Sequence, residues 1–143
     1  MNRTAISAYA ALGLALTIGM PEAGAQSTSK CRPADWRSDG IISHLKYRIS
    51  ATDPRDIRLR DSVYRIPVVP PNQITVVTDE RICAKLVDAY SRGASGWVPV
   101  NLYVIKLGDN HYAVMDPEHK AGGFSMVMIY DSKYVRVGGW TGG

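Results

Sequence analysis

Residues 74–90 constrain the fold more than any other segment, because they predict a short strand that runs directly into an amphipathic helix. Thr78 is the expected N-cap, Asp79 and Glu80 suit the first turn, and Gly93 is the expected C-cap. Apolar residues recur in the helix at three- and four-residue intervals: Ile82, Cys83, Leu86, Val87, Ala89 and Tyr90. Such a stripe must be buried against another element.

The strands expected after Gly96 are the partner of this helix. Alternating residues predict a first strand whose aliphatic face carries Val98, Val100, Leu102 and Val104. A hairpin turn follows at residues 108–110, and further strands are expected at residues 112–115, 124–130 and 134–137, before a glycine-rich tail at 138–143. Short connections of this kind make a sheet antiparallel. We therefore expect an α+β fold, with one central helix on an antiparallel sheet of about four strands. This two-layer arrangement resembles cystatin-like and nuclear-transport-factor-like folds.

The N-terminal half is less regular. Residues 39–50 fit both a helical stripe and an alternating strand, and a helix from about Asp39 is favoured. Thr52-Asp53-Pro54 marks a turn or a new helix start. Residues 57–60 alternate as an edge strand does, and three prolines follow within residues 67–71. We expect residues 53–73 to be mostly irregular.

Charges of both signs are mixed within this irregular half. Four arginines alternate with three aspartates: Arg55, Arg58, Arg60, Arg65, Asp53, Asp56 and Asp61. The mixture favours a solvated face, with an anion-binding site as the alternative. The formal net charge of +4 is spread along the chain, so no dense basic face indicates nucleic acid as a partner.

The first 25 residues have the layout of a secretory signal peptide. Arg3 precedes an apolar run over residues 5–20, and Ala23-Gly24-Ala25 provides the expected cleavage site. Polar residues interrupt the run, which is shorter than the roughly 20 residues that a membrane-spanning helix needs. We therefore expect a secreted or periplasmic protein with residues 26–143 as a single domain and no membrane span after cleavage.

Cys31 and Cys83 are the only cysteines of the chain. An even pair in an exported protein predicts one disulfide, which would tie the mature N-terminus to the central helix. The pairing also removes the most readily activated nucleophile from consideration.

Three short motifs occur together in the C-terminal half. They are Val-Thr-Asp-x-x-x-Cys at residues 77–83, Ala89-Tyr90, and Tyr-x-Val-x-Asp-Pro at residues 112–117. This layout resembles a group of short, uncharacterised secreted bacterial proteins. The resemblance implies export and a structural role for the motifs, and it brings no activity with it.

The densest set of potential metal ligands is His111, Asp116, Glu118 and His119. Strand alternation places His111 and Asp116 on opposite faces of the sheet, and the other two fall in a turn. We therefore predict no metal and no cofactor. His44 is expected at the surface. The sequence contains no Ser-His-Asp order, phosphate loop or zinc spacing.

A second apolar set is left over once the helix is satisfied. Tyr103, Ile105, Phe124, Met126, Met128 and Tyr130 are expected on one sheet face, opposite the aliphatic face that also takes Val127 and Ile129. The N-terminal half is expected to cover this second face. In the alternative it is an exposed platform, where Tyr103, Phe124, Met126 and Met128 contact a ligand or partner.

These patterns support two hypotheses of function. The first is an exported, non-enzymatic binding module for a protein or a small apolar ligand. The second is a small secreted hydrolase with a cleft between helix and sheet.

Overall fold

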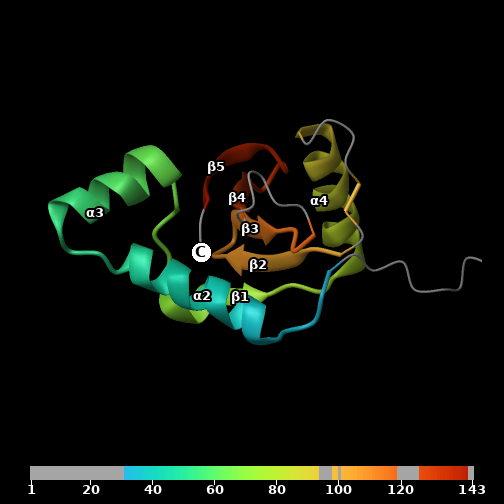
Figure 1. Ribbon diagram of the computed structural model, residues 1–143, viewed down its shortest axis with the longest axis horizontal. Coiled ribbons are helices and arrows are strands. Elements are labelled where there is room, and N and C mark those ends of the chain that lie inside the picture. Colours follow the sequence, from blue (N-terminus) through green and yellow to red (C-terminus); the bar gives the residue numbers. More distant parts are fainter. Residues whose placement is uncertain (1–30, 94–97, 100, 119–125, 142–143) are drawn as a thin grey trace, which may run out of the picture.

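The computed structural model describes residues 31–93, 98–99, 101–118 and 126–141. Its centre is a five-stranded antiparallel sheet whose strand order follows the chain: β1 (Ile74–Val76), β2 (Tyr103–Leu107), β3 (His111–Met115), β4 (Met126–Asp131) and β5 (Arg136–Thr141). Helices lie on both sides, with α4 on one side of the sheet and α2 and α3 on the other (Figure 1). The predicted α+β class with an antiparallel sheet is confirmed.

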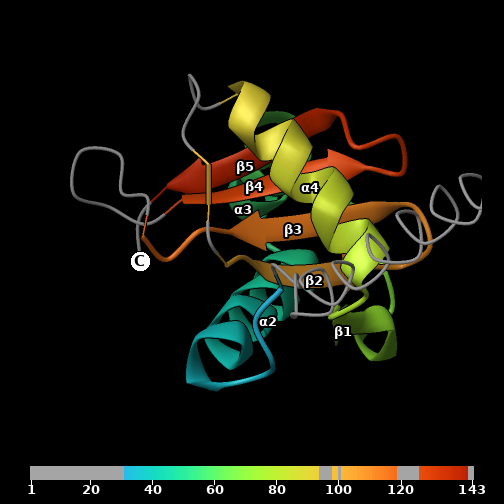
Figure 2. The same cartoon turned by 90° about the vertical axis from the view of Figure 1, so that its right-hand side faces the viewer.

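Helix α4 (Glu80–Gly93) is the predicted central helix and lies across the sheet (Figure 2). Its N-cap is Asp79 and not Thr78, because the Asp79 carboxylate accepts hydrogen bonds from the backbone N–H groups of Arg81 at 2.9 Å and Ile82 at 3.2 Å. A carboxylate satisfies these donors and also complements the positive end of the helix. Gly93 is the last helical residue and does not lie beyond the helix. The predicted stripe is confirmed, since its core members are buried: Cys83, Leu86, Ala89 and Tyr90.

Each face of the sheet has its own core. Under α4 lie the even-numbered residues of the three central strands: Leu102 beside β2, Val104, Tyr112, Val114, Met128 and Tyr130. The odd-numbered residues pack on the other face with Ile41 and Leu45 of α2: Tyr103, Ile105, Ala113, Met115, Val127 and Ile129. Burying one such large apolar side chain contributes about 1.5–3 kcal/mol.

The grouping of faces expected from the sequence is therefore wrong for β4. Met128 pairs with Val114, which pairs with Val104, so all three share the α4 face. Met126 and Met128 were expected beside Tyr103, yet they lie on the opposite face from it. A short hairpin turn fixes the register of the two strands that it joins, but ten residues separate β3 from β4. The alternation within β4 shows that its odd and even residues lie on opposite faces, but it does not show which set faces α4. Val98 is exposed and does not extend the aliphatic face, and Val100 lies outside the described residues.

Helix α2 (Trp36–Ile49) covers the second face, as expected of the N-terminal half. It begins three residues before the predicted Asp39, because Asp35 and Ser38 form a capping box. The Asp35 carboxylate accepts from the backbone N–H of Arg37 at 2.8 Å, and the Ser38 hydroxyl accepts from the backbone N–H of Asp35 at 2.8 Å.

Residues 53–73 are mostly helical, so the expected edge strand and irregular segment are wrong. Helix α3 (Pro54–Arg58) is capped by Asp53, whose carboxylate accepts from the backbone N–H of Arg55 at 2.8 Å. A π-helix, η2 (Leu59–Tyr64), continues it, and a 3₁₀ turn, η3 (Pro71–Gln73), precedes β1. Asp53-Pro54 is a strong signal for the start of a helix, and it prevails over the strand-like alternation, which covers only four residues.

The glycine-rich tail is partly a strand. β5 runs through residues 138–141 to Thr141, and Trp140 is buried in the α2-side core. The expected signal peptide and its cleavage site lie outside the described residues. Within the described part of the chain, no helix is long and apolar enough to cross a membrane.

Candidate functional site

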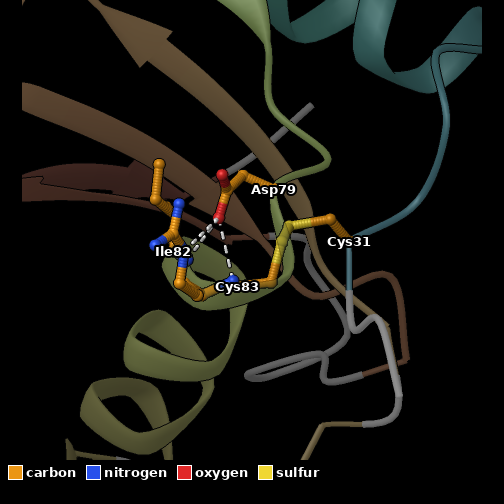
Figure 3. Close-up of a disulfide and its surroundings, with 5 residues drawn as sticks. Cys31, Asp79, Ile82 and Cys83 are labelled. Carbon is orange, nitrogen blue, oxygen red and sulfur yellow. Dashed lines mark hydrogen bonds and ion pairs between the residues drawn. A yellow bond between two sulfur atoms is a disulfide. The ribbon is translucent and has the colours of Figure 1, made fainter. Parts of the chain in front are cut away.

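The predicted disulfide between Cys31 and Cys83 is confirmed, with their Cα atoms 5.6 Å apart. Figure 3 shows it joining the segment before α2 to the first turn of α4, beside the Asp79 cap. Both cysteines are buried, and the backbone N–H of Arg32 donates to the Leu102 carbonyl at 2.8 Å. The bond is consistent with an oxidising compartment, and the two cysteines serve as a structural link.

The residues predicted to contact a ligand or partner do not form one surface. Tyr103 is fully buried under α2, whereas Met128 is buried under α4. Met126 is partly buried on the α4 side, and Phe124 lies outside the described residues. Their contact with a ligand stays a prediction.

The potential metal ligands are separated as strand alternation predicted. His111 begins β3 and faces η2, while Asp116 is buried near Tyr90 of α4. Burial, and after it the Asp116 carboxylate, raises the pKa of Tyr90. Asp116 also accepts a hydrogen bond from the backbone N–H of Glu118 at 3.0 Å, and His119 lies outside the described residues. No group of three or more histidine, cysteine or carboxylate side chains in the described residues is placed to hold a metal ion.

An open hollow lies where η2 meets β3 and β5. This open groove, here called the η2 groove, has a volume of about 670 Å³. One half of its lining is polar: Asp61, Ser62, Arg65 and His111. The other half is apolar: Ile66, Pro67, Val68 and Val137. The groove is open to solvent, and it brings polar and apolar side chains together in one hollow.

Arg65 stands at the groove in a left-handed backbone conformation, with φ 54° and ψ 51°. It directly follows the π-helix, and the backbone N–H groups of Arg65 and Ile66 both donate to the Arg60 carbonyl. For a residue other than glycine, this conformation costs about 1–2 kcal/mol. Both π-helical turns and left-handed residues of this kind are frequent at functional sites.

Gly138 of β5 allows this strained segment to sit against the sheet. A Cβ atom at Gly138 would lie 2.1 Å from the Tyr64 carbonyl oxygen and 2.8 Å from the Arg65 Cβ atom. The strand pairing of β4 with β5 is also irregular between Ile129 and Tyr130, directly opposite this point. Only glycine fits here, so the chain at position 138 is matched to the conformation of Arg65.

A cluster of aromatic rings packs between α2, η2 and β5. Trp140 of β5 stacks on His44 of α2, with ring centres 4.8 Å apart, and it also meets Tyr64 at 6.3 Å. The Arg48 guanidinium lies over the Tyr64 ring at 4.9 Å and donates from Nε to His44 Nε2 at 3.2 Å. Burial, and then the charge of Arg48, lowers the pKa of His44. His44 is thus half-buried in a cluster, and its expected surface position is wrong.

Salt bridging neutralises one acidic side chain of the groove. Asp61 accepts two hydrogen bonds from the Arg60 guanidinium, at 2.7 Å and 3.2 Å, and Arg60 Nη1 donates to the Ile49 carbonyl at 2.9 Å. The hydrogen bond from Arg60 lowers the pKa of Asp61.

Asp131 faces His111 across the β3–β4 pair. Hydrogen bonds from the backbone, chiefly from Val135, lower the pKa of Asp131, with a smaller contribution from His111.

The sequence pointed to parts of this groove but not to the groove itself. Arg65 belongs to the charge mixture for which an anion site was the alternative, and His111 belongs to the potential metal ligands. Ser62, Val137 and Gly138 were not singled out, because no motif marks a π-helix or a close approach between distant segments. The Pro67 region was interpreted only as a break in regular structure.

A comparison of the chain with protein families, with curated proteins and with solved structures finds no match.

Proposed function

We propose that this chain is an exported, non-enzymatic binding module that holds a small ligand in the η2 groove. The observation that carries the proposal is Arg65, a left-handed residue at the groove that is seated against Gly138 of the sheet. Strained residues persist only where their surroundings over-determine them, and they cluster at ligand sites. The fold thus stabilises a costly conformation at one particular hollow.

The lining of the groove supports binding of a small ligand. Its volume of about 670 Å³ lies within the range of roughly 300–1,000 Å³ that is usual for such sites. Val68 and Val137 supply apolar contact area, while Ser62 and Arg65 supply hydrogen-bond donors. A few polar groups set in an apolar lining orient a small molecule.

The test is a fragment screen by NMR that compares two variants. Ser62→Trp places a large ring in the groove, and Ser43→Trp places the same ring on the exposed side of α2 as the control. We expect fragments that shift the amide signals of groove residues in the native protein and in Ser43→Trp, but not in Ser62→Trp. Fragments that leave the groove signals unmoved, or that bind Ser62→Trp equally well, would refute the proposal.

A hydrolase is the second candidate, because Ser62 and His111 line the same groove and Asp131 is the cross-strand partner of His111. These are the residue types of a nucleophile, a base and an orienting acid. Against this, no hydrogen bond joins the three side chains within the described residues. Hydrolysis of p-nitrophenyl butyrate that is abolished in Ser62→Ala would favour the enzyme. We expect no turnover above that of the Ser62→Ala variant.

Export is the other part of the proposal. The disulfide of Cys31 and Cys83 supports it, because such bonds persist in oxidising compartments. Mass spectrometry of protein recovered from the periplasm or the medium should find a chain that begins at Gln26. A chain that retains residues 1–25 and is found only in the cytoplasm would contradict export.

A further inference from the structure

We infer that the ligand of the η2 groove carries an anionic group, a carboxylate or a phosphate, joined to a short aliphatic part, and that Arg65 binds the anion. The inference rests on the proposed function and names the chemical class that the groove would take. It also places at Arg65 the anion-binding site that was the alternative interpretation of the mixed charges in residues 53–65.

The first argument is the charge balance of the groove. Asp61 is the acidic residue of the lining, and its carboxylate already accepts two hydrogen bonds from Arg60. Arg60 is itself anchored by its hydrogen bond to the Ile49 carbonyl. The Arg60–Asp61 pair is therefore fixed and electrically neutral, and Asp61 does not neutralise Arg65.

The second argument is that the Arg65 guanidinium is uncompensated. Within residues 31–93, 98–99, 101–118 and 126–141, its side chain has no ion pair and no hydrogen bond. It is exposed at the groove, where its planar group can offer two parallel donors to one anion. Arg65 is therefore the charged side chain of the lining that is free to pair with an anionic group of a ligand.

His111 and Ser62 complete the polar side. His111 is the cross-strand partner of Asp131, whose carboxylate lies outside the groove lining and accepts hydrogen bonds from the backbone N–H groups of Lys133 and Val135. The Ser62 hydroxyl is an additional donor on the same wall. Among the charged side chains that line the groove, Asp61 is already paired with Arg60, so Arg65 is available to match a negative group on the ligand.

The apolar side defines the remainder of the ligand. Ile66, Pro67, Val68 and Val137 adjoin Arg65 in the lining, and Val68 is 62 % exposed. Ile66 is already buried, so an aliphatic segment next to the anionic group would cover Pro67, Val68 and Val137 and would remove Val68 from water.

The experiment is a titration of the ¹⁵N-labelled, disulfide-bonded protein followed by NMR. The probes are butyrate, inorganic phosphate and butyramide, which has nearly the shape of butyrate but no charge. We expect butyrate to shift the signals of Ser62, Arg65 and His111, with a Kd about tenfold below that of butyramide. If phosphate competes with butyrate, the anion site accepts both groups; if it does not, the class is a carboxylate.

Variants at position 65 separate recognition from folding. Arg65→Gly accepts φ 54° without strain, and Arg65→Asn tolerates it, so neither should lower the melting temperature. Both should raise the Kd for butyrate about tenfold, to that of butyramide. Arg58→Gln removes the same charge from exposed α3, outside the groove lining, and should leave butyrate binding unchanged.

Two results would overturn the inference, and they differ in what they leave standing. If butyrate and butyramide bind the groove equally, and Arg65→Gly changes neither, the anion inference fails while the groove remains a binding site. If no probe shifts the groove signals, and the fragment screen also finds no ligand there, the proposed function fails together with the inference.

Discussion

The Tyr103 hydroxyl donates a hydrogen bond to the Asp35 carboxylate, with 2.5 Å between the two oxygens. Tyr103 is the first residue of β2 and is fully buried, whereas Asp35 is the N-cap of α2. The Arg32 guanidinium lies over the same tyrosine ring at 5.2 Å from its centre. One side chain of the sheet therefore holds the N-cap residue of α2 against β2.

Replacing Tyr103 by phenylalanine should make the protein less stable and less sensitive to acid. The hydrogen bond from Tyr103 is the largest cause that lowers the pKa of Asp35. The stability from such a carboxylate is present above its unfolded pKa, about 3.9, and is lost as the pH falls through the lower folded pKa. Melting temperatures from about pH 5 to about pH 2 should therefore decline less steeply in Tyr103→Phe. Tyr47→Phe, on the exposed side of α2, is the control, and equal slopes in all three proteins would contradict the prediction.

Two glycines should respond to alanine in opposite directions. A Cβ atom at Gly138 meets the Tyr64 carbonyl, so Gly138→Ala should destabilise the fold by at least roughly 1–3 kcal/mol. Gly40 lies inside α2 with nothing within 4 Å of its added Cβ, so Gly40→Ala should stabilise by roughly 0.5–1 kcal/mol. Denaturant unfolding measures both changes. A neutral Gly138→Ala would show that η2 does not need its close approach to β5.

Removing the disulfide should cost about 4 kcal/mol of unfolding free energy, because its loop spans 52 residues of sequence separation. The double variant Cys31→Ala/Cys83→Ala and the reduced native protein should lose similar amounts in urea unfolding. Alkylation followed by mass measurement should find two thiols after reduction and none before it. Two reactive thiols in unreduced protein would contradict the bond.

His44 should make the fold weaken in mild acid. Its pKa is lowered in the folded state, so the unfolded chain takes up a proton first as the pH falls below about 6.5, and stability decreases from there. His44→Phe keeps a ring on Trp140 but cannot be protonated, so its stability should change less between about pH 7 and about pH 5. The NMR titration of the His44 ring should have its midpoint below 6.5. A midpoint at or above this value would refute the assignment.

Local patterns in the sequence predicted the elements that depend on neighbouring residues. The stripe of α4 follows from residue spacing, the turn at residues 108–110 from its residue types, and the disulfide from an even cysteine pair in a chain expected to be exported. All three are present. The face of Met128 depended on the register between β3 and β4, which no local signal fixes across a ten-residue connection.

The η2 groove could not be predicted because its parts come together only in three dimensions. Arg65 takes its left-handed conformation at the end of the π-helix. Glycine is needed at position 138 because the Tyr64 carbonyl leaves no room for a Cβ atom. These residues are more than seventy positions apart in the chain, and no sequence motif indicates that they lie close together. Sequence patterns could show the surplus of arginine there, but not which arginine would line the groove.

The strand order of the sheet, which follows the chain, also bears on how the protein folds. Each pairing from β2 to β5 joins strands that are consecutive in sequence, so these four strands can assemble without closing a long loop. Helix α2 and Cys31 must instead find partners far along the chain, which costs more loop-closure entropy. We therefore expect a nucleus in β2–β5 to form first and the cysteines to be oxidised after it. The disulfide would then stabilise a native topology that the sheet has already established.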